Sequence, residues 1–207
     1  MSISRKITEG AGSGSGGGSG GYVDDVFSTY LYTGNTEKGR DIVNGIDLDG
    51  EGGLVWIKAR GNKANGSASS HILTDTERGL NSALSTNKAN AESLEYQQVT
   101  AFNNNGFTID DASEVNMGDF NGWPAIDFTS WTFRKAPSFF DVVTYTGNGV
   151  QNRAVPHGLG CTPGMVIIKS VSVSRDWHVW HNSFPEWTGG TTEGDISGSN
   201  DVGRLQL

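Results

Sequence analysis

The chain has 207 residues, of which 35% are hydrophobic and 18% charged, with 30 glycines and a net charge of −8. This length accommodates one large or two modest globular units, and the low charge and abundant glycine favour a turn-rich β protein over a helical bundle. Phosphate binding needs basic surface and a membrane span needs a long apolar run, so the composition argues against a nucleic-acid partner and membrane insertion.

Residues 1–21 form an N-terminal leader. Residues 12–21 are all Gly or Ser, a composition that cannot bury enough apolar area to offset its chain entropy and therefore predicts a flexible tether. An engineered linker is the alternative interpretation. No apolar stretch follows Arg5 and Lys6, so no secretory signal is predicted.

From residue 22 onward, strand-like and turn-like segments alternate. The strand-like segments are 26–32, 53–58, 70–74, 98–102, 107–109 and 126–133. Residues 103–106 (NNNG) predict a hairpin between two of these segments. A change of apolar face near Ser130 predicts a bulge, and the only helix-like window is 87–96. The spacing of the strands predicts an all-β sandwich or jelly roll.

An internal repeat divides the chain. Residues 27–35 (FSTYLYTGN) recur 113 residues later as 140–148 (FDVVTYTGN), and the same offset pairs Arg40 with Arg153. After a short deletion, 53–58 (GLVWIK) aligns with 164–169 (GMVIIK), and His71 can be set against His178. These are residues that turns and buried strands need, so they predict a shared fold rather than a shared active site.

The repeat predicts two tandem related β-modules. We define the first module as residues 22–137 and the second module as residues 138–207. A complete second module would need residues beyond Leu207, because the segments 106–109 and 131–137 have no counterparts. The second module is therefore expected to be incomplete, either because it is shortened or because the natural chain continues past Leu207.

Three acidic residues, Asp47, Asp49 and Glu51, have the spacing of a small Ca²⁺ loop, since hard cations prefer several oxygens around a tight turn. The full EF-hand pattern is absent, and the second module has no acids at the equivalent place. We therefore predict no metal site and no cofactor, and regard these three residues as weak candidates.

Two tryptophans stand close together in residues 177–181 (WHVWH). Exposed Trp rings are platforms for sugars, so Trp177, Trp180 and Trp187 are candidate glycan contacts, although core or interface packing is the favoured interpretation. On a strand, His178 and His181 would point to opposite faces and would not share a metal.

No catalytic constellation stands out. Asp110, Asp111, Asp119 and Asp127 are available for glycoside hydrolysis, but no spacing singles out a pair. Cys161, the single cysteine, lies in a turn and precludes an intramolecular disulfide. The expectation is a protein that is not an enzyme.

Several sequence segments resemble a module of tail-fibre and other structural proteins of marine tailed phages, including cyanophages. They are residues 1–10, 44–58 (NGIDLDGEGGLVWIK), 75–79 (DTERG), 131–137 (WTFRKAP), 140–147 (FDVVTYTG) and 163–165 (PGM). The resemblance covers nearly the whole chain and thins after residue 183. It supplies no catalytic residues.

The resemblance implies a virion structural protein, a tail-fibre or tail-attached component made in the host cytoplasm and engaged in assembly and host attachment. The leader would dock to other virion proteins through residues Ser2, Ile3, Arg5, Lys6 and Ile7. By analogy with phage fibres, we expect a homotrimer. The alternatives are a host polysaccharide or receptor-binding module, and a head decoration or capsid-fibre protein.

Overall fold

The computed structural model describes residues 22–183, except 64, 65, 81, 95–97, 120, 121 and 123. The leader and the segment 184–207 lie outside the described residues. Nearly all regular structure is β, as the composition predicts. The elements are η1 (Val23–Asp25), β1 (Phe27–Thr33), β2 (Arg40–Val43), β3 (Gly53–Ala59), β4 (Ile72–Asp75), β5 (Val99–Asn103), β6 (Gly106–Ile109), α1 (Ser113–Asn116), β7 (Asp127–Arg134), β8 (Met165–Ile168) and β9 (His178–His181).

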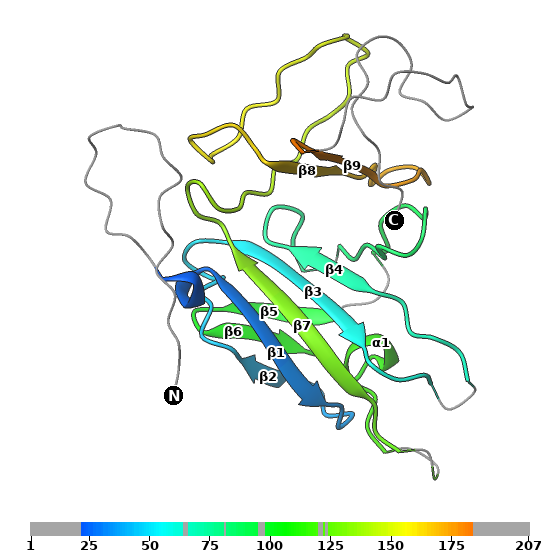
Figure 1. Ribbon diagram of the computed structural model, residues 1–207. Coiled ribbons are helices and arrows are strands. Elements are labelled where there is room, and N and C mark those ends of the chain that lie inside the picture. The colour runs from blue at the N-terminus through cyan, green and yellow to red at the C-terminus, as the bar shows by residue number, and fades with distance from the viewer. Residues whose placement is uncertain are drawn as a thin grey trace.

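The first module is a β-sandwich of two antiparallel sheets (Figure 1). One sheet has the strand order β1-β7-β3-β4 and the other β2-β6-β5. β7 is the central strand of the larger sheet, because it pairs with β1 along one edge and with β3 along the other. The segment 103–106 does connect a hairpin, β5–β6, and Gly106 is required there because a Cβ atom would stand 2.0 Å from the Ile42 carbonyl oxygen.

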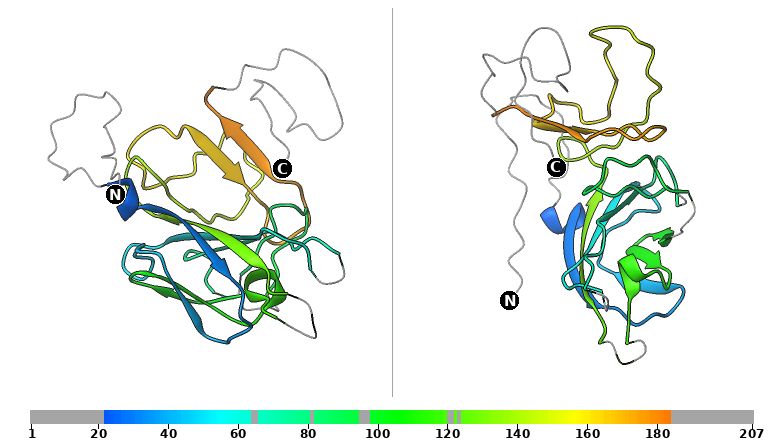
Figure 2. Two further views of the ribbon diagram at one scale, coloured as in Figure 1. Left: turned by 60° about the horizontal axis from the view of Figure 1, so that its bottom comes forward. Right: turned by 90° about the vertical axis from the view of Figure 1, so that its right-hand side faces the viewer.

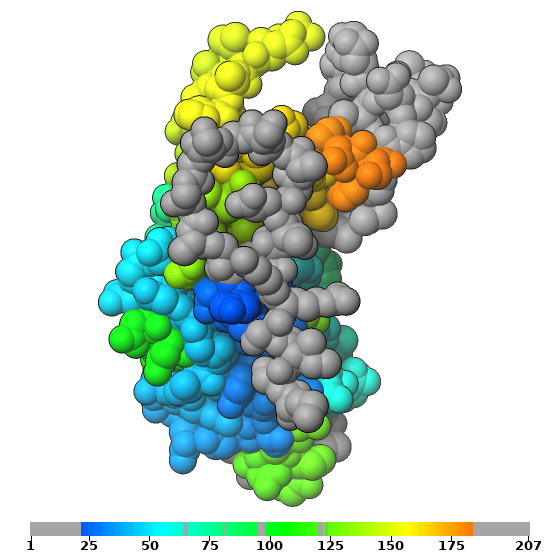
Figure 3. Space-filling view, turned by 60° about the vertical axis from the view of Figure 1, so that its left-hand side comes forward, coloured from blue at the N-terminus to red at the C-terminus, as the bar shows by residue number. Residues whose placement is uncertain are grey.

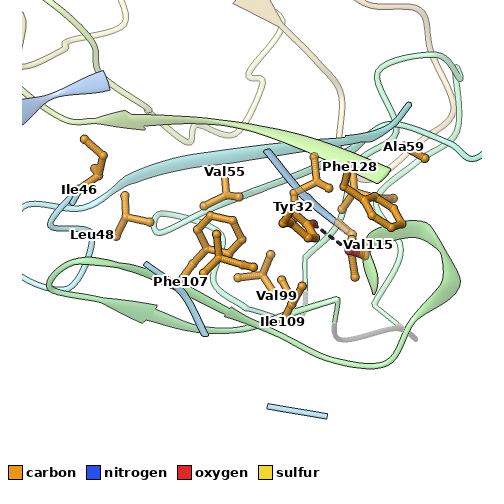
Figure 4. Packing of buried hydrophobic residues seen from close by; sticks show 14 of the residues in the cluster. Tyr32, Ile46, Leu48, Val55, Ala59, Val99, Phe107, Ile109, Val115 and Phe128 are labelled. Carbon is orange, nitrogen blue, oxygen red and sulfur yellow. Dashed lines mark hydrogen bonds between the residues drawn. The ribbon is translucent and has the colours of Figure 1, made fainter. Parts of the chain in front are cut away.

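The core lies between the two sheets (Figure 4). Val55, Ile57 and Phe128 come from the larger sheet and Phe107 and Ile109 from the smaller one, and all five are fully buried. Strand alternation brings these residues to one face, as period-2 patterning requires.

The predicted bulge near Ser130 is wrong. β7 keeps one continuous register with β1 and with β3. Phe128, Ser130 and Thr132 all face the core and are fully buried, so the core face changes from an aromatic ring to small hydroxyl residues without a change of register. The register shift occurs instead in β5, between Val99 and Ala101.

The helix-like window 87–96 contains no helix in its described part. Ser93 instead forms an antiparallel bridge with Ala83, the amide of each donating to the carbonyl oxygen of the other. The described α-helix is the single turn α1, whose Val115 carbonyl accepts a 2.7 Å hydrogen bond from the Tyr32 hydroxyl.

Residues 138–183 form a smaller body above the larger sheet of the first module (Figure 2). β8 and β9 pair as a two-stranded antiparallel sheet. The segment 138–164, green to yellow in the figures, runs out from the end of β7 and returns to β8, and its yellow part projects from the rest of the molecule in the space-filling view (Figure 3).

The repeat is visible in the local geometry of both modules. Arg40 donates from Nη1 to the Thr33 carbonyl and stands over the Tyr32 ring, and Arg153 does the same to Thr146 and Tyr145. Positive φ values recur at the same offset, at 36 and 39 in the first module and at 149 and 152 in the second. The two turns therefore share one backbone conformation.

The strand register corrects one part of the repeat alignment. Ile57 pairs with Ile72 in the first module, and its equivalent Ile168 pairs with His178 in the second. His178 is therefore equivalent to Ile72 rather than to His71. A slip of one residue changes the face of every side chain in a strand. The alignment placed Trp180 at the position of Leu73, whereas the strand register places Val179 there.

Candidate assembly surface

The three acidic candidates do not converge. Asp47 Oδ1 accepts a hydrogen bond of 2.9 Å from the Gly50 amide, and Asp49 and Glu51 are exposed. Within the described residues, no group of three or more His, Cys, Asp or Glu side chains is placed to hold a metal ion. Asp47 thus stabilises the turn that leads into β3.

Trp177 is an interface residue. Its side chain is only 5% exposed and packs with Leu73 and Leu84 of the first module. Its indole Nε1 donates to the carbonyl oxygens of Ser85 at 3.3 Å and Lys88 at 3.1 Å. A ring held in this way is not available to a sugar, and it joins the second module to the first.

The other two tryptophan candidates differ from Trp177. Trp180 lies on β9 and is partly buried, on the opposite face of the strand from Val179. Trp187 lies outside the described residues, as do the docking candidates Ser2, Ile3, Arg5, Lys6 and Ile7.

The aspartates considered for glycoside hydrolysis make local contacts. Asp110 accepts a hydrogen bond from the next amide, Asp119 from the Ala125 amide and Asp127 from the Thr33 hydroxyl. Asp111 faces Lys38 at 3.6 Å. These contacts order turns and a strand end.

A buried ion network occupies the loop after β4, and sequence reasoning missed its role. Arg78 pairs with Asp75 and Glu92, at 2.7 Å in each case, and the three side chains are 8%, 3% and 16% exposed. Asp75 Oδ1 also accepts the amides of Glu77 and Arg78. The DTERG motif thus builds the loop on which the second module rests.

An open hollow of about 340 Å³ lies where the two modules meet. Glu77, Lys135, Asp141 and His157 contribute polar groups to its lining. Lys135 Nζ lies 2.6 Å from Glu77 and 3.5 Å from Asp141, and the hydrogen bond with Glu77 raises the pKa of Lys135 above its usual range. Lys135 thus pairs with an acid of each module, and the ion pairs in this hollow connect the two modules.

The apolar surface is concentrated in the second module. Its large exposed apolar side chains are Val143, Tyr145, Val150, Met165, Ile167, Ile168, Val171 and Val173. Two of them, Tyr145 and Ile168, are repeat equivalents of the core residues Tyr32 and Ile57. Tyr145 is 48% exposed where Tyr32 is 8% exposed, and Ile168 is 42% exposed where Ile57 is fully buried.

The repeat-equivalent residues differ in exposure because, in the described structure, the second module has no second β-sheet layer. Its equivalents of core residues are therefore left uncovered. Tyr32 is covered by Phe128 of β7, whose ring stacks on it at 5.3 Å. Contiguous exposed apolar surface marks a site of association in soluble proteins. We define the candidate assembly surface as the exposed apolar side chains of β8 (Met165, Ile167 and Ile168) together with Val143 and Tyr145 of the segment 140–146.

A protein family described as a domain of unknown function, DUF7483, matches residues 23–193. The chain belongs to this family. The matched span begins at η1 and continues past β9, so the DUF7483 domain includes the candidate assembly surface together with the sandwich. No curated protein and no solved structure matches the chain. Within the described residues, no helix is long and apolar enough to span a membrane.

Proposed function

We propose that this protein is a non-catalytic structural component of a bacteriophage virion, a tail-fibre or tail-attached subunit engaged in assembly and host attachment. The observation that carries the structural role is the exposed apolar surface of the second module, which contrasts with the sealed core of the first. A subunit of a larger assembly buries such a surface against its neighbours. The phage setting is supported by the resemblance of residues 44–58, 131–137 and 140–147.

Two features fit an assembly role. The acidic charge of the chain keeps a large assembly soluble. The Gly/Ser composition of residues 12–21 suits a tether between a docking segment, with Ser2, Ile3, Arg5, Lys6 and Ile7, and the β-modules. In this proposal the leader attaches the protein to other virion proteins and the modules associate as a homotrimer.

Electron microscopy of purified virions, labelled with an antibody against the first module, tests the proposal. We expect the label on the tail. Label confined to the capsid would replace the tail assignment with the head-decoration alternative, and virions without label would contradict the virion role. Native mass measurement tests the trimer separately, since a monomer or a hexamer at virion-like concentration would contradict it.

A further inference from the structure

The strand that closes the first module has no counterpart among the described residues of the second. β7 lies between β1 and β3 and pairs with both. The second module supplies the equivalents of its neighbours, with β8 in the place of β3 and the segment 140–146 in the place of β1. The structure describes no strand between them.

The lack of strand pairing along residues 141–146 follows from this difference. β1 has β7 as its single neighbouring strand. The equivalent segment keeps the same turn and the same Arg–Tyr contact as β1, and yet it forms no strand along 141–146. A strand is maintained by its ladder of hydrogen bonds, so this segment has the sequence of a β-strand and lacks the partner that would order it.

Aromatic packing at the junction between β7 and the second module fixes the start of the segment 140–146, beside which such a partner would enter. Phe133 of β7 lies 4.9 Å from Phe27 and 5.2 Å from Phe140, measured between ring centroids. Phe27 and Phe140 are repeat equivalents. One face of the junction is therefore packed, while β8 and the rest of 140–146 stay open beyond it.

We propose that the second module binds an extended strand with the pattern of β7, supplied by another polypeptide, which enters antiparallel to β8 between β8 and residues 140–146. The first module shows what fills the equivalent place. β7 fills that place, and its inward face carries Phe128, Ser130 and Thr132, all fully buried. The partner strand would accordingly present one large aromatic residue against Tyr145 and small hydroxyl residues against β8. This inference does not depend on a virion origin.

A second copy of the chain fits less well. Pairing of β8 with β8 of another copy would cover that strand edge and leave residues 140–146 and Tyr145 open. A strand can form hydrogen bonds along both of its edges, so a single inserted strand would pair with β8 on one edge and with residues 140–146 on the other, as in other cases of strand addition. The described strands that carry this pattern are already engaged in their own sheets, so none of them supplies the inserted strand, and a separate polypeptide is the source that the peptide experiment represents.

The test uses the full chain and a dye-labelled peptide of residues 125–136 (AIDFTSWTFRKA) as the probe, with a scrambled peptide of the same composition as its control. We expect saturable binding by fluorescence anisotropy for the first peptide alone. Amide hydrogen exchange should slow in residues 140–146 and 165–168 when the peptide is bound.

A matched pair of variants locates the site. Ile168→Asp places a carboxylate on β8, and Val173→Asp places one at a similarly exposed position outside β8. Ile168→Asp should weaken peptide binding at least about ten-fold, because the bound peptide would bury an unpaired carboxylate between the strands. Val173→Asp should leave the affinity unchanged, and the circular dichroism of both variants should match that of the parent.

Three results would overturn the inference. The peptide does not bind, or binds the Ile168→Asp variant equally well. Exchange slows in β1 or β4, the edge strands of the larger sheet, instead of β8. Sedimentation shows a dimer of the chain that Ile168→Asp dissociates while the peptide has no effect, which would assign the surface to a second copy.

Discussion

Two regions of this chain share local geometry and differ in burial. The turns at 33–40 and 146–153 have the same Arg-to-carbonyl hydrogen bond and the same Arg–Tyr contact. Tyr32 nevertheless lies in a closed core, whereas Tyr145 is exposed. Local sequence thus specifies the turn, while burial depends on a strand distant in sequence, β7.

The largest expected effect concerns the loop that supports the second module. Arg78→Ala leaves Asp75 and Glu92 as buried carboxylates without their cation, so we expect a loss of about 3–5 kcal/mol in the free energy of unfolding. Urea denaturation measures it. The control is Lys38→Ala, because the exposed pair with Asp111 contributes about 0–1 kcal/mol. Equal losses in the two variants would contradict the structural role of the network.

The next prediction tests the attachment of the second module. Trp177→Ala removes the buried indole between the modules and should cost about 3 kcal/mol of stability in β8 and β9. Hydrogen exchange should accelerate in residues 165–168 and 178–181 and stay unchanged in β7. Trp180→Ala, at a partly buried position, is the matched control and should have the smaller effect. Unchanged exchange in Trp177→Ala would show that the modules are joined elsewhere.

A smaller effect separates the two repeat-related tyrosines. Tyr32→Phe loses the hydrogen bond to the Val115 carbonyl, which we expect to cost about 1 kcal/mol, while Tyr145→Phe should be close to neutral. Burial raises the pKa of Tyr32 above its ordinary value. Stability from the neutral phenol is therefore present below about pH 10, and it falls as the pH rises above the pKa of the unfolded chain.

Alkaline denaturation checks this sign. The parent should lose stability as the pH rises above about 10, and Tyr32→Phe should lose less over the same range. If the Tyr145→Phe variant alone altered the alkaline transition, the assignment of the closed core to the first module would be wrong.

The smallest effect is acid-dependent. Trp56 Nε1 donates a 3.1 Å hydrogen bond to His71 Nδ1, and burial, with Lys58 nearby, lowers the pKa of His71. The stability from neutral His71 is thus present above the ordinary histidine pKa of about 6.5 and is lost as the pH falls through the lowered value. Trp56 fluorescence should change in that acidic window. The change should be absent in His71→Gln, and its persistence would assign the titration to another group.

Much of the fold followed from the sequence. The strands β1, β3, β4, β5, β6 and β7, the hairpin at 103–106 and the sandwich class were predicted because alternation and turn residues act locally, whereas β2 was missed. The bulge near Ser130 was a wrong prediction because small hydroxyl residues in a core look polar in sequence. The one-residue slip at His178 was missed because an alignment does not contain strand register.

The candidate assembly surface could not be predicted from the sequence, because it depends on which side chains are buried. Sequence favoured core or interface packing for Trp177 over a sugar contact, and the contacts with Leu73 and Leu84 show that it is buried. The role of the DTERG motif in a buried ion network could not be predicted, because Glu92, which pairs with Arg78, is fourteen residues away in the sequence. The repeat did predict that the second module lacks its closing segments, and β8 is the strand whose neighbour is missing among the described residues.

The difference between the modules is tested most directly by one pair of substitutions at repeat-equivalent positions. Ile57→Ala should cost about 2–5 kcal/mol of unfolding free energy, because Ile57 is fully buried, and Ile168→Ala should cost less than about 1 kcal/mol, because Ile168 is 42% exposed. Urea denaturation of the two variants beside the parent gives both values. A clear difference in this direction is the predicted result, and equal costs would contradict an open second module.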